Sequence, residues 1–416
     1  MGNKHLLGLD ISRDPGILLR RPRRVLLVEP AYKVKYPPLG LMKISTYHKQ
    51  QGDEVVFYKG TNVELRDQEW DLIYITTMFT FQWNITINTI KFYQRNKLKN
   101  KNIKVGGILA SLLQEDVENE TGIIPHFGLW QEVDRLAPDY TLTNGIYNYY
   151  TNNASIGYMT KGCPNRCPYC AVPKLEPQYV HFIPLENQID PNKKDLILLD
   201  NNVLASVEFP RIVEEIKKHG FQKGAKFGNA HRYVDFNQGV DARLLTEEKM
   251  TLLSEIAIKP LRIAFDHIEL KRLYIEKIRL AHKYGIKHLS NFILFNYNDT
   301  PDDFYERLRI NIELNEELDL SIFSFPMKFI PLHAKDRKYV DNPHWTKQQL
   351  RGVQCILNAT HGVVGPKRPF FEKAFGKDAD EFKYIIEQPE EIIFHRENMK
   401  PYKHLSAAYS LTADIR

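Results

Sequence analysis

Three of the four cysteines in this chain lie within eight residues, in the run Cys163-Pro-Asn-Arg-Cys167-Pro-Tyr-Cys170. The run contains two prolines and follows Gly162, so a tight loop can turn three thiolates toward one point. Thiolates are soft ligands that suit zinc and iron–sulfur clusters. A [4Fe-4S] cluster has four irons, so three thiolates leave one iron with an open coordination position. The spacing therefore predicts a [4Fe-4S] cluster in which one iron is open for chemistry.

The competing interpretation of the same cysteines is a structural zinc site, with His181 as the fourth ligand. Zinc sites usually combine a C-x-x-C pair with a second cysteine pair or with two histidines. The sequence contains no such partner pair, and this favours the cluster. The function that would go with zinc is a non-enzymatic metal-binding module, in which three cysteines only stabilise the fold.

The pattern Cys163-x-x-x-Cys167-x-Tyr-Cys170 resembles the signature of the radical S-adenosylmethionine (SAM) enzymes. The resemblance implies that the amino and carboxylate groups of SAM chelate the open iron. It also implies that a reductant such as flavodoxin or ferredoxin supplies an electron, which splits SAM to a 5'-deoxyadenosyl radical. Tyr169 matches the aromatic residue that packs near the adenine of SAM in this family.

The elements that must position this loop alternate between short apolar runs and longer helical runs. A strand at residues 155–159 leads directly into the cysteine loop. Five more strands are predicted at 196–200, 233–238, 261–266, 288–295 and 320–325, with helices at 209–219, 246–256, 270–284 and 300–315. Six strands match the partial (β/α)6 barrel of radical SAM enzymes. In α/β barrels the chemistry gathers at the carboxyl ends of the strands.

Polar side chains after the second of these strands are the first candidate SAM ligands. Asp200, Asn201 and Asn202 stand where the family often has Gly-Gly-Glu, or an acidic substitute, that holds the amino group of SAM. Their carboxylate and amide oxygens offer hydrogen-bond acceptors to an ammonium group. We therefore expect these three residues to bind the amino group of SAM.

Further candidate ligands follow the third, fourth and fifth strands. Gln238 and Arg243 follow the third, and Arg243 could bind the carboxylate of SAM through two parallel hydrogen bonds. An ion pair of Arg243 with Asp241 or Glu247 explains this arginine nearly as well. Asp266, next to His267 at the end of the fourth strand, could bind the ribose hydroxyls. Residues 295–301 stand where the family has Gly-x-Pro-Gly-x-Thr, but the glycines are missing here.

The half of the chain before the cysteine loop is predicted to be a Rossmann-like, doubly wound domain. Strands at 24–30, 54–58, 71–77 and 102–105 alternate with helices. The turns Pro37-Pro38-Leu39-Gly40 and Gly106-Gly107 resemble those of the cobalamin-binding domain found in one radical SAM branch. The Asp-x-His-x-x-Gly motif that holds cobalamin in such domains is absent, and His48 lies in a helical run without it. We therefore do not expect cobalamin as a cofactor; a corrinoid held without a protein ligand is the alternative.

The predicted fold class is α/β, with four parts. These are an N-terminal arm (1–20), the Rossmann-like domain and linker (21–150), the partial barrel (151–335) and an α-rich C-terminal extension (336–416). We expect the extension to close the mouth of the barrel, with Cys355 as a small core residue of a helix at 346–358. A second cysteine cluster is absent, which counts against methylthiotransferase chemistry.

Charge and composition bound the partners of the protein. The net charge of the 416 residues is +6, compatible with a polyanionic partner such as nucleic acid. The positive residues include two clusters, Arg20, Arg21, Arg23 and Arg24, and Lys91, Arg95, Lys97, Lys99, Lys101 and Lys104. A solvated surface is the alternative explanation. The cysteine usage favours a reducing, cytoplasmic location, and no apolar run is long enough to predict a membrane span.

Together these patterns predict a radical SAM enzyme that cleaves SAM reductively and acts on an unidentified substrate. The basic clusters slightly favour a nucleic acid or nucleotide as that substrate. The alternative is a small metabolite or a peptide.

Overall fold

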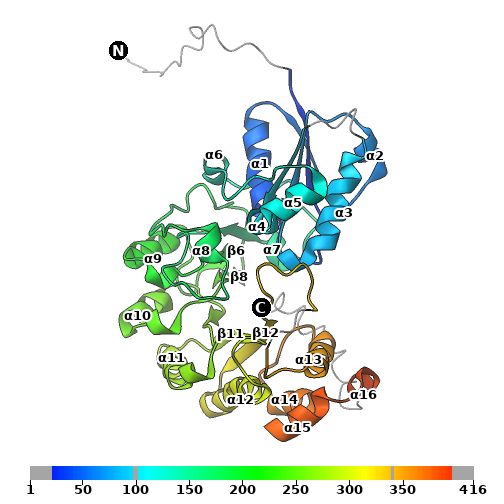
Figure 1. The fold of residues 1–416 in the computed structure, drawn as a ribbon. Helices are drawn as coiled ribbons and strands as arrows, with labels where there is room; N and C mark the ends of the chain where they lie inside the picture. Colours follow the sequence, from blue (N-terminus) through cyan, green and yellow to red (C-terminus); the bar gives the residue numbers. More distant parts are fainter. Residues whose placement is uncertain (1–20, 97–101, 339–341, 396–416) are drawn as a thin grey trace, which may run out of the picture.

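The computed structural model describes residues 21–96, 102–338 and 342–395. The expected N-terminal arm lies outside the described residues, as do Arg20, Lys97, Lys99 and Lys101 of the two basic clusters. Two α/β units follow one another along the chain, and a group of helices ends it (Figure 1).

The first unit is a parallel sheet of four strands, as the alternation of strands and helices predicted. The strands are β1 (Arg24–Glu29), β2 (Glu54–Lys59), β3 (Leu72–Thr77) and β4 (Ile103–Gly107), in the order β2-β1-β3-β4. Helix α1 (Leu39–Gln50) packs on one face, and α3 (Trp83–Gln94) and α5 (Gln114–Thr121) cover the other. The central strand β1 is apolar from Val25 to Val28 because both faces of the sheet are buried there.

The second unit contains the six expected strands, and the barrel that they form is open. The strands are β5 (Ala154–Gly157), β6 (Asp195–Leu198), β9 (Val234–Phe236), β10 (Leu261–Arg262), β11 (His288–Phe295) and β12 (Ser321–Lys328). Parallel pairing joins β5-β6-β9 and β10-β11-β12. Two parallel bridges, Val234 to Ile258 and Val240 to Ile263, connect the two groups into one series.

Helices cover the outside of this open barrel (Figure 1). They are α9 (Phe209–Lys218), α10 (Glu247–Glu255), α11 (Lys271–Lys283) and α12 (Pro301–Leu318). The start of α12 shows why the sequence signal was clear. The Thr300 side chain accepts from the Asp303 backbone, and the Asp303 carboxylate accepts from the Thr300 backbone, which makes a capping box.

Short elements complete the two units. They are α2 (Val63–Asp67), α4 (Ile108–Leu112), α6 (Gln131–Asp134), α7 (Tyr149–Asn152), α8 (Val172–Leu175), β7 (Lys226–Phe227), β8 (Ala230–His231) and the 3-10 turns η2 (Thr80–Gln82), η3 (Val203–Ala205), η4 (Ala242–Leu244) and η5 (Ile268–Leu270). The hairpin β7–β8 was not predicted, because its strands have only two residues each.

The C-terminal helices pack mainly on α12, and the segment before them contacts the loop after β11, where Asn342 donates to the Tyr297 carbonyl at 2.7 Å. Helices α13 (Lys347–Ala359), α14 (Arg368–Phe375), α15 (Ala379–Ile386) and α16 (Glu390–His395) form one core with apolar residues of α12. Val364 also bridges to Ser324 on β12. The physical reason is that α12 has a second apolar face and β12 has an open edge, and both need cover. Cys355 is fully buried in this core, as predicted.

The two units meet at the carboxyl ends of their strands. Helix α4 follows β4 directly, and it packs against α8, which follows the cysteine loop. Lys335, beyond β12, forms an ion pair with Asp116 on α5 and lies over the ring of Trp83. No helix among the described residues is long and apolar enough to cross a membrane.

Two tyrosines from outside the barrel fill its interior. The Tyr36 hydroxyl accepts from Asn237, and the Tyr150 hydroxyl donates to Asp235 at 2.7 Å. Asp235 also forms a bidentate ion pair with the buried Arg262, at 2.7 and 2.8 Å. Tyr36 and Tyr150 pack against the apolar residues of β5 and β6.

Candidate functional site

The cysteine loop begins at the carboxyl end of β5 and is anchored there by one buried carboxylate. Asp200 Oδ1 accepts hydrogen bonds from the backbone of Met159 at 3.0 Å and of Thr160 at 2.5 Å, and from the Thr160 hydroxyl. Gly162 has a φ of 71°, and a Cβ there would lie 2.5 Å from the carbonyl oxygen of Gln178. The entry to the loop therefore requires glycine at this position.

The three thiols of the loop are free and half-buried. Burial raises the pKa of Cys170, and the neighbouring thiols of Cys167 and Cys163 raise it further. Iron bound to the thiolates would offset the repulsion between their charges. In a [4Fe-4S] cluster each thiolate binds a different iron.

The zinc alternative gains no support from the geometry. In the described ranges, no three His, Cys, Asp or Glu side chains are grouped around a single metal position. His181, the expected fourth ligand, accepts a hydrogen bond at Nδ1 from the Val207 backbone at 3.3 Å. Its ring also packs edge-on against Tyr179.

Two buried acceptors without a partner lie beside the cysteine loop. The Oδ2 atom of Asp200 and the Oδ1 atom of Asn202 have no hydrogen-bond partner. Asn202 reaches the loop, because its Nδ2 lies 3.5 Å from the sulfur of Cys163. Burial raises the pKa of Asp200 to about 6. An unpaired buried acceptor costs free energy, so these atoms fit a ligand that donates hydrogen bonds, such as an ammonium group.

Asn201 lies in the same turn, but its side chain is bonded elsewhere. Its Nδ2 donates to Glu176 at 2.8 Å, and the same carboxylate oxygen accepts from the Gly162 backbone at 2.7 Å. Asn201 therefore helps to hold the base of the cysteine loop.

The aromatic residue of the motif lies in a cluster of rings at the same end of the barrel. Tyr169 donates to Asp266 at 3.1 Å, which joins two of the predicted site residues. Its ring packs against Tyr297 at 5.2 Å and His267 at 6.1 Å between centroids. Phe329 packs against Tyr297 in turn. These rings form a surface suited to stacking or edge contact with a planar base.

The loop after β11 forms its turn without the glycines of the Gly-x-Pro-Gly-x-Thr pattern. Asn296 has a φ of 63°, in the left-handed region, and asparagine is one of the few residues that tolerates it. Its Nδ2 donates to Phe329 at 3.4 Å, while its buried Oδ1 has no partner. Asn296 therefore allows the turn to form, and its side chain adds a buried Oδ1 atom without a hydrogen-bond partner.

In the part of the chain that the structure describes, the candidates after β9 form no hydrogen bond with Asp200 or Asn202, and the partner of Arg243 lies elsewhere. Gln238 is exposed in the turn that follows the strand. Arg243 forms a bidentate pair with Asp241 at 2.8 and 2.7 Å, the alternative that the sequence left open. Asp241 also accepts from Asn165 in the cysteine loop at 2.9 Å. Asp241 therefore contacts the cysteine loop, and Arg243 is paired with that carboxylate.

Three residues that support the site were not recognised in the sequence. Glu176 holds Gly162, and the Tyr179 hydroxyl donates to the Asn202 carbonyl at 2.7 Å. Arg307, fully buried on α12, donates to carbonyls at the ends of β10 and β11 and to Asp299 at 2.8 Å. Only the position of Glu176 and Tyr179 shortly after the cysteines could have suggested their role.

Comparison with known proteins identifies the fold. No family model and no curated protein matches the sequence. The radical SAM methyltransferase TsrM from Kitasatospora setae, solved with cobalamin and a [4Fe-4S] cluster, matches with a TM-score of 0.53 and 15% identity. The match covers 75% of this chain and 77% of TsrM. This chain shares the fold of TsrM.

A second structure of TsrM, with tryptophan substrate and the SAM analogue aza-SAM bound, matches with a TM-score of 0.54 and 16% identity. It covers 75% of each chain. The cobalamin-dependent SAM radical enzyme OxsB is also similar, with a TM-score of 0.49, 14% identity and coverage of 70% of this chain and 52% of OxsB.

The TsrM likeness confirms the predicted architecture, a Rossmann-like unit followed by a partial barrel. The expectation that cobalamin is not a cofactor gains no support, because TsrM was solved with cobalamin bound.

Proposed function

We propose that this protein is a radical SAM enzyme. The observation that carries the proposal is the pair of unpartnered buried acceptors, on Asp200 and Asn202, next to a loop with three free thiols. The fold shared with TsrM supports it, because the loop lies at the carboxyl end of the barrel strands.

Each group at the site has a role in this proposal. Cys163, Cys167 and Cys170 hold a [4Fe-4S] cluster that, with SAM bound, supplies a 5'-deoxyadenosyl radical for hydrogen abstraction. Asp200 and Asn202 accept hydrogen bonds from the amino group of SAM. Tyr169, His267 and Tyr297 pack against its adenine, and Asp266 accepts from a ribose hydroxyl.

Anaerobic reconstitution with iron and sulfide tests the cluster. We expect about four irons per chain, a brown protein and a reduced electron paramagnetic resonance signal that changes when SAM is added. The Cys167→Ala variant should lose the cluster, whereas Cys355→Ala, which removes the buried cysteine of α13, should keep it. A colourless protein that binds one zinc per chain would contradict the proposal.

Cleavage of SAM tests the enzyme activity. Reconstituted protein with dithionite should produce 5'-deoxyadenosine, and a flavodoxin or ferredoxin should replace dithionite as the electron donor. A protein that binds the cluster and SAM but yields no 5'-deoxyadenosine would reject the radical mechanism.

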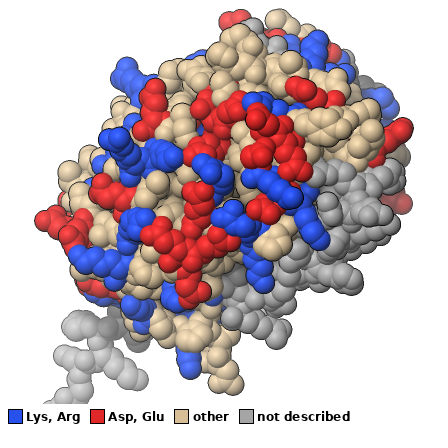
Figure 2. All heavy atoms as spheres, turned by 90° about the horizontal axis from the view of Figure 1, so that it is seen from below, with Lys and Arg blue, Asp and Glu red and all other residues tan. Residues whose placement is uncertain are grey.

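The proposed substrate is a small metabolite or a peptide, which was the alternative in the sequence. The described residues of the basic clusters are largely paired with acids: Arg21 with Asp71, Arg23 with Asp53, Arg24 with Glu54 and Lys91 with Glu120. The basic clusters belong to the first unit, at the top of Figure 1; on the opposite face, seen from below, Figure 2 shows Lys and Arg mixed with Asp and Glu. Nucleic acid is the other outcome: RNA bound with a steep salt dependence would favour it.

Cobalamin-dependent chemistry is a second candidate function. It is favoured by the meeting of the two carboxyl edges through α4 and α8. The residues do not fit a histidine-ligated corrinoid, because His48 is buried at the far end of α1, where Asp53 and Tyr74 hold both ring nitrogens. His126, beside the end of β4, is exposed and lies outside any such motif.

Glu29, at the carboxyl end of β1, is buried and bonded to Lys59 and Tyr147. These residues therefore do not fit a corrinoid held by a histidine or carboxylate ligand. Incubation with hydroxocobalamin followed by gel filtration separates the two candidates: about one corrinoid retained per chain would favour methyl transfer, and loss of the corrinoid would favour hydrogen abstraction alone.

A further inference from the structure

A pocket of about 350 Å³ lies at the end of the barrel away from the cysteine loop. Its lining residues stand at the amino ends of strands: Tyr233 precedes β9, Lys259 precedes β10 and His288 begins β11. These strands run parallel to β5, whose carboxyl end carries the cysteine loop. The pocket is therefore separate from the proposed SAM site, and nothing in the proposed function uses it.

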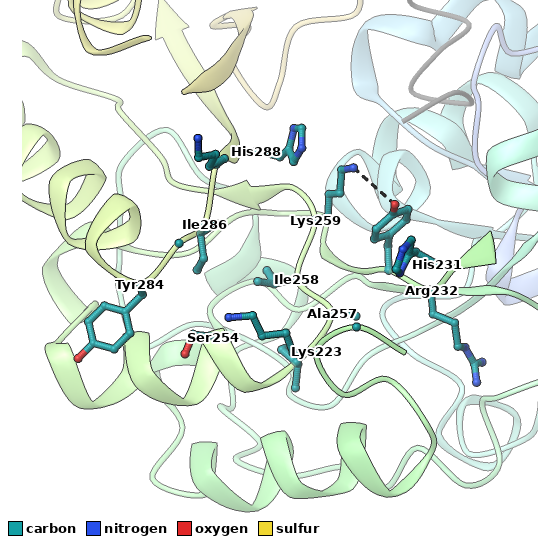
Figure 3. A pocket seen from close by; sticks show the side chains of 15 residues that line it. Lys223, His231, Arg232, Ser254, Ala257, Ile258, Lys259, Tyr284, Ile286 and His288 are labelled. Atoms are coloured by element: carbon teal, nitrogen blue, oxygen red, sulfur yellow. Dashed lines mark hydrogen bonds between the residues drawn. The ribbon is translucent and has the colours of Figure 1, made fainter. Parts of the chain in front are cut away.

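The pocket combines an apolar floor with a basic rim. Ile258 and Ile286 are on the floor, and Figure 3 shows them between Lys223 on one side and His288 on the other. The side chain of Arg232 points away. Cationic or imidazole side chains also come from His231, Lys259 and Lys287, and no acidic residue among the described ones lines the pocket.

Two of the lysines that line this pocket are not paired with a carboxylate of any described residue. Neither Lys223 nor Lys259 forms an ion pair within the part of the chain that the structure describes. Lys259 lies over the ring of Tyr233 at 4.6 Å, and Lys194 lies over the same ring at 4.9 Å. Among the cations around the pocket, Lys194 is paired with Asp195 and Lys287 with Asp319.

The pKa values of Lys259 and His288 are lowered in part by neighbouring positive charges. Burial lowers the pKa of Lys259, and the charge of Lys194 lowers it further. Burial likewise lowers the pKa of His288, with contributions from Lys259 and Lys287. The cations around the pocket therefore repel one another, and an anion bound between them would relieve that repulsion.

We propose that this pocket binds a small phosphate monoester with an apolar body. The phosphate would lie at the basic rim beside Lys223 or Lys259, where it would accept charge-assisted hydrogen bonds. The apolar body would cover Ile258 and Ile286, whose side chains form the floor. The volume is in the range of small-molecule sites, which are mostly apolar with a few polar groups.

Isothermal titration of the full-length protein with phenyl phosphate, inorganic phosphate and phenol tests the site. Phenyl phosphate should bind once per chain. Inorganic phosphate should bind more weakly because it leaves the floor uncovered, and phenol should not bind detectably because it lacks the charge. Binding of phenyl phosphate should weaken as salt is added.

The double variant Lys223→Gln/Lys259→Gln should weaken the binding of phenyl phosphate by at least about tenfold. The matched control is Lys226→Gln, which removes an exposed charge on β7 outside the pocket lining, and its affinity should change less than about twofold. Equal weakening by both variants, or no binding of phenyl phosphate, would overturn the proposal. RNA binding that all three substitutions weaken alike would instead assign this face to nucleic acid. None of these outcomes depends on the cluster, so failure here leaves the proposed function untouched.

Discussion

Asp200 uses its two carboxylate oxygens differently. Oδ1 fixes the entry to the cysteine loop through Met159 and Thr160, while Oδ2 is buried without a partner. The side-chain amide of Asn202 is divided in the same way. Its Nδ2 contacts the sulfur of Cys163, and its Oδ1 has no hydrogen-bond partner. One turn after β6 therefore shapes the cluster loop and also offers acceptors to whatever binds next to it.

Substitution of Asn202 tests this division. Asn202→Ala removes one unpaired acceptor, so the affinity for SAM should fall about tenfold, while the iron content stays unchanged. Gln238→Ala is the contrast, since Gln238 is exposed and its loss should leave the affinity unchanged. Equilibrium dialysis of reconstituted protein measures both. The roles are wrong if Gln238→Ala causes the larger loss.

The raised pKa of Asp200 predicts a pH dependence. Burial raises this pKa to about 6, so the carboxylate is neutral below that pH and ionised above it. The ionised carboxylate is the better acceptor for the N–H groups of the SAM amino group, and the affinity for SAM should therefore fall as the pH drops through about 6. Asp200→Asn should show lower affinity at pH 7 without that dependence. An identical pH profile in both proteins would contradict the role.

At the scale of elements, the sequence predicted the strands and helices better than their contacts. Strand β1 is a continuous apolar run from Val25 to Val28, and α12 carries its own capping box. The hairpin β7–β8 and the packing of α13 to α16 depend on contacts between distant segments. For the same reason the cysteine loop could be recognised, whereas the Arg243–Asp241 pair and the Arg307 contacts could not be chosen from the sequence.

The packing of α13 makes a prediction about glycine. A Cβ on Gly352 would lie 2.1 Å from the carbonyl oxygen of Ile386, so Gly352→Ala should destabilise the protein by about 1–3 kcal/mol. In contrast, Gly40 on α1 has nothing within 4 Å of an added Cβ, and Gly40→Ala should be neutral or stabilising by about 0.5 kcal/mol. Urea unfolding measures both; similar effects of the two substitutions would refute the close α13 contact.

At the scale of the molecule, a buried charge cluster joins the two units. Asp134 on α6 is bonded to Lys43 from α1 and to Tyr158 and Lys161 at the start of the cysteine loop. Both lysines are nearly buried, and each also lies over the ring of Tyr158. The loop that is proposed to hold iron is therefore tied to the first unit as well as to its own barrel.

Removal of the Asp134 charge should be costly, because it leaves two buried ammonium groups unpaired. We expect Asp134→Asn to lower stability by about 3 kcal/mol. Asp116→Asn, which breaks the half-exposed pair with Lys335, should cost less than about 1 kcal/mol. Thermal unfolding measures the stability that each variant loses. Equal losses in the two variants would show that Asp134 does not hold the two units together.

The same carboxylate predicts a dependence of stability on acid. Burial would raise the pKa of Asp134, but Lys43, Lys161 and Tyr158 lower it below its ordinary value of 3.8. The stability that it contributes is therefore present above about pH 4 and is lost as the pH falls further. Asp134→Asn should lack this part of the acid transition.

Tyr36 and Tyr150 enter the barrel from outside it, and this has a consequence for how the chain can be divided. A fragment starting after Tyr150 would uncover the Asp235–Arg262 pair and the apolar inner wall of β5 and β6 to water. Such a fragment would precipitate during expression, however many irons it could hold. The two α/β units therefore cannot be exchanged as independent modules, because Tyr36 and Tyr150, which precede the barrel strands, pack against β5 and β6.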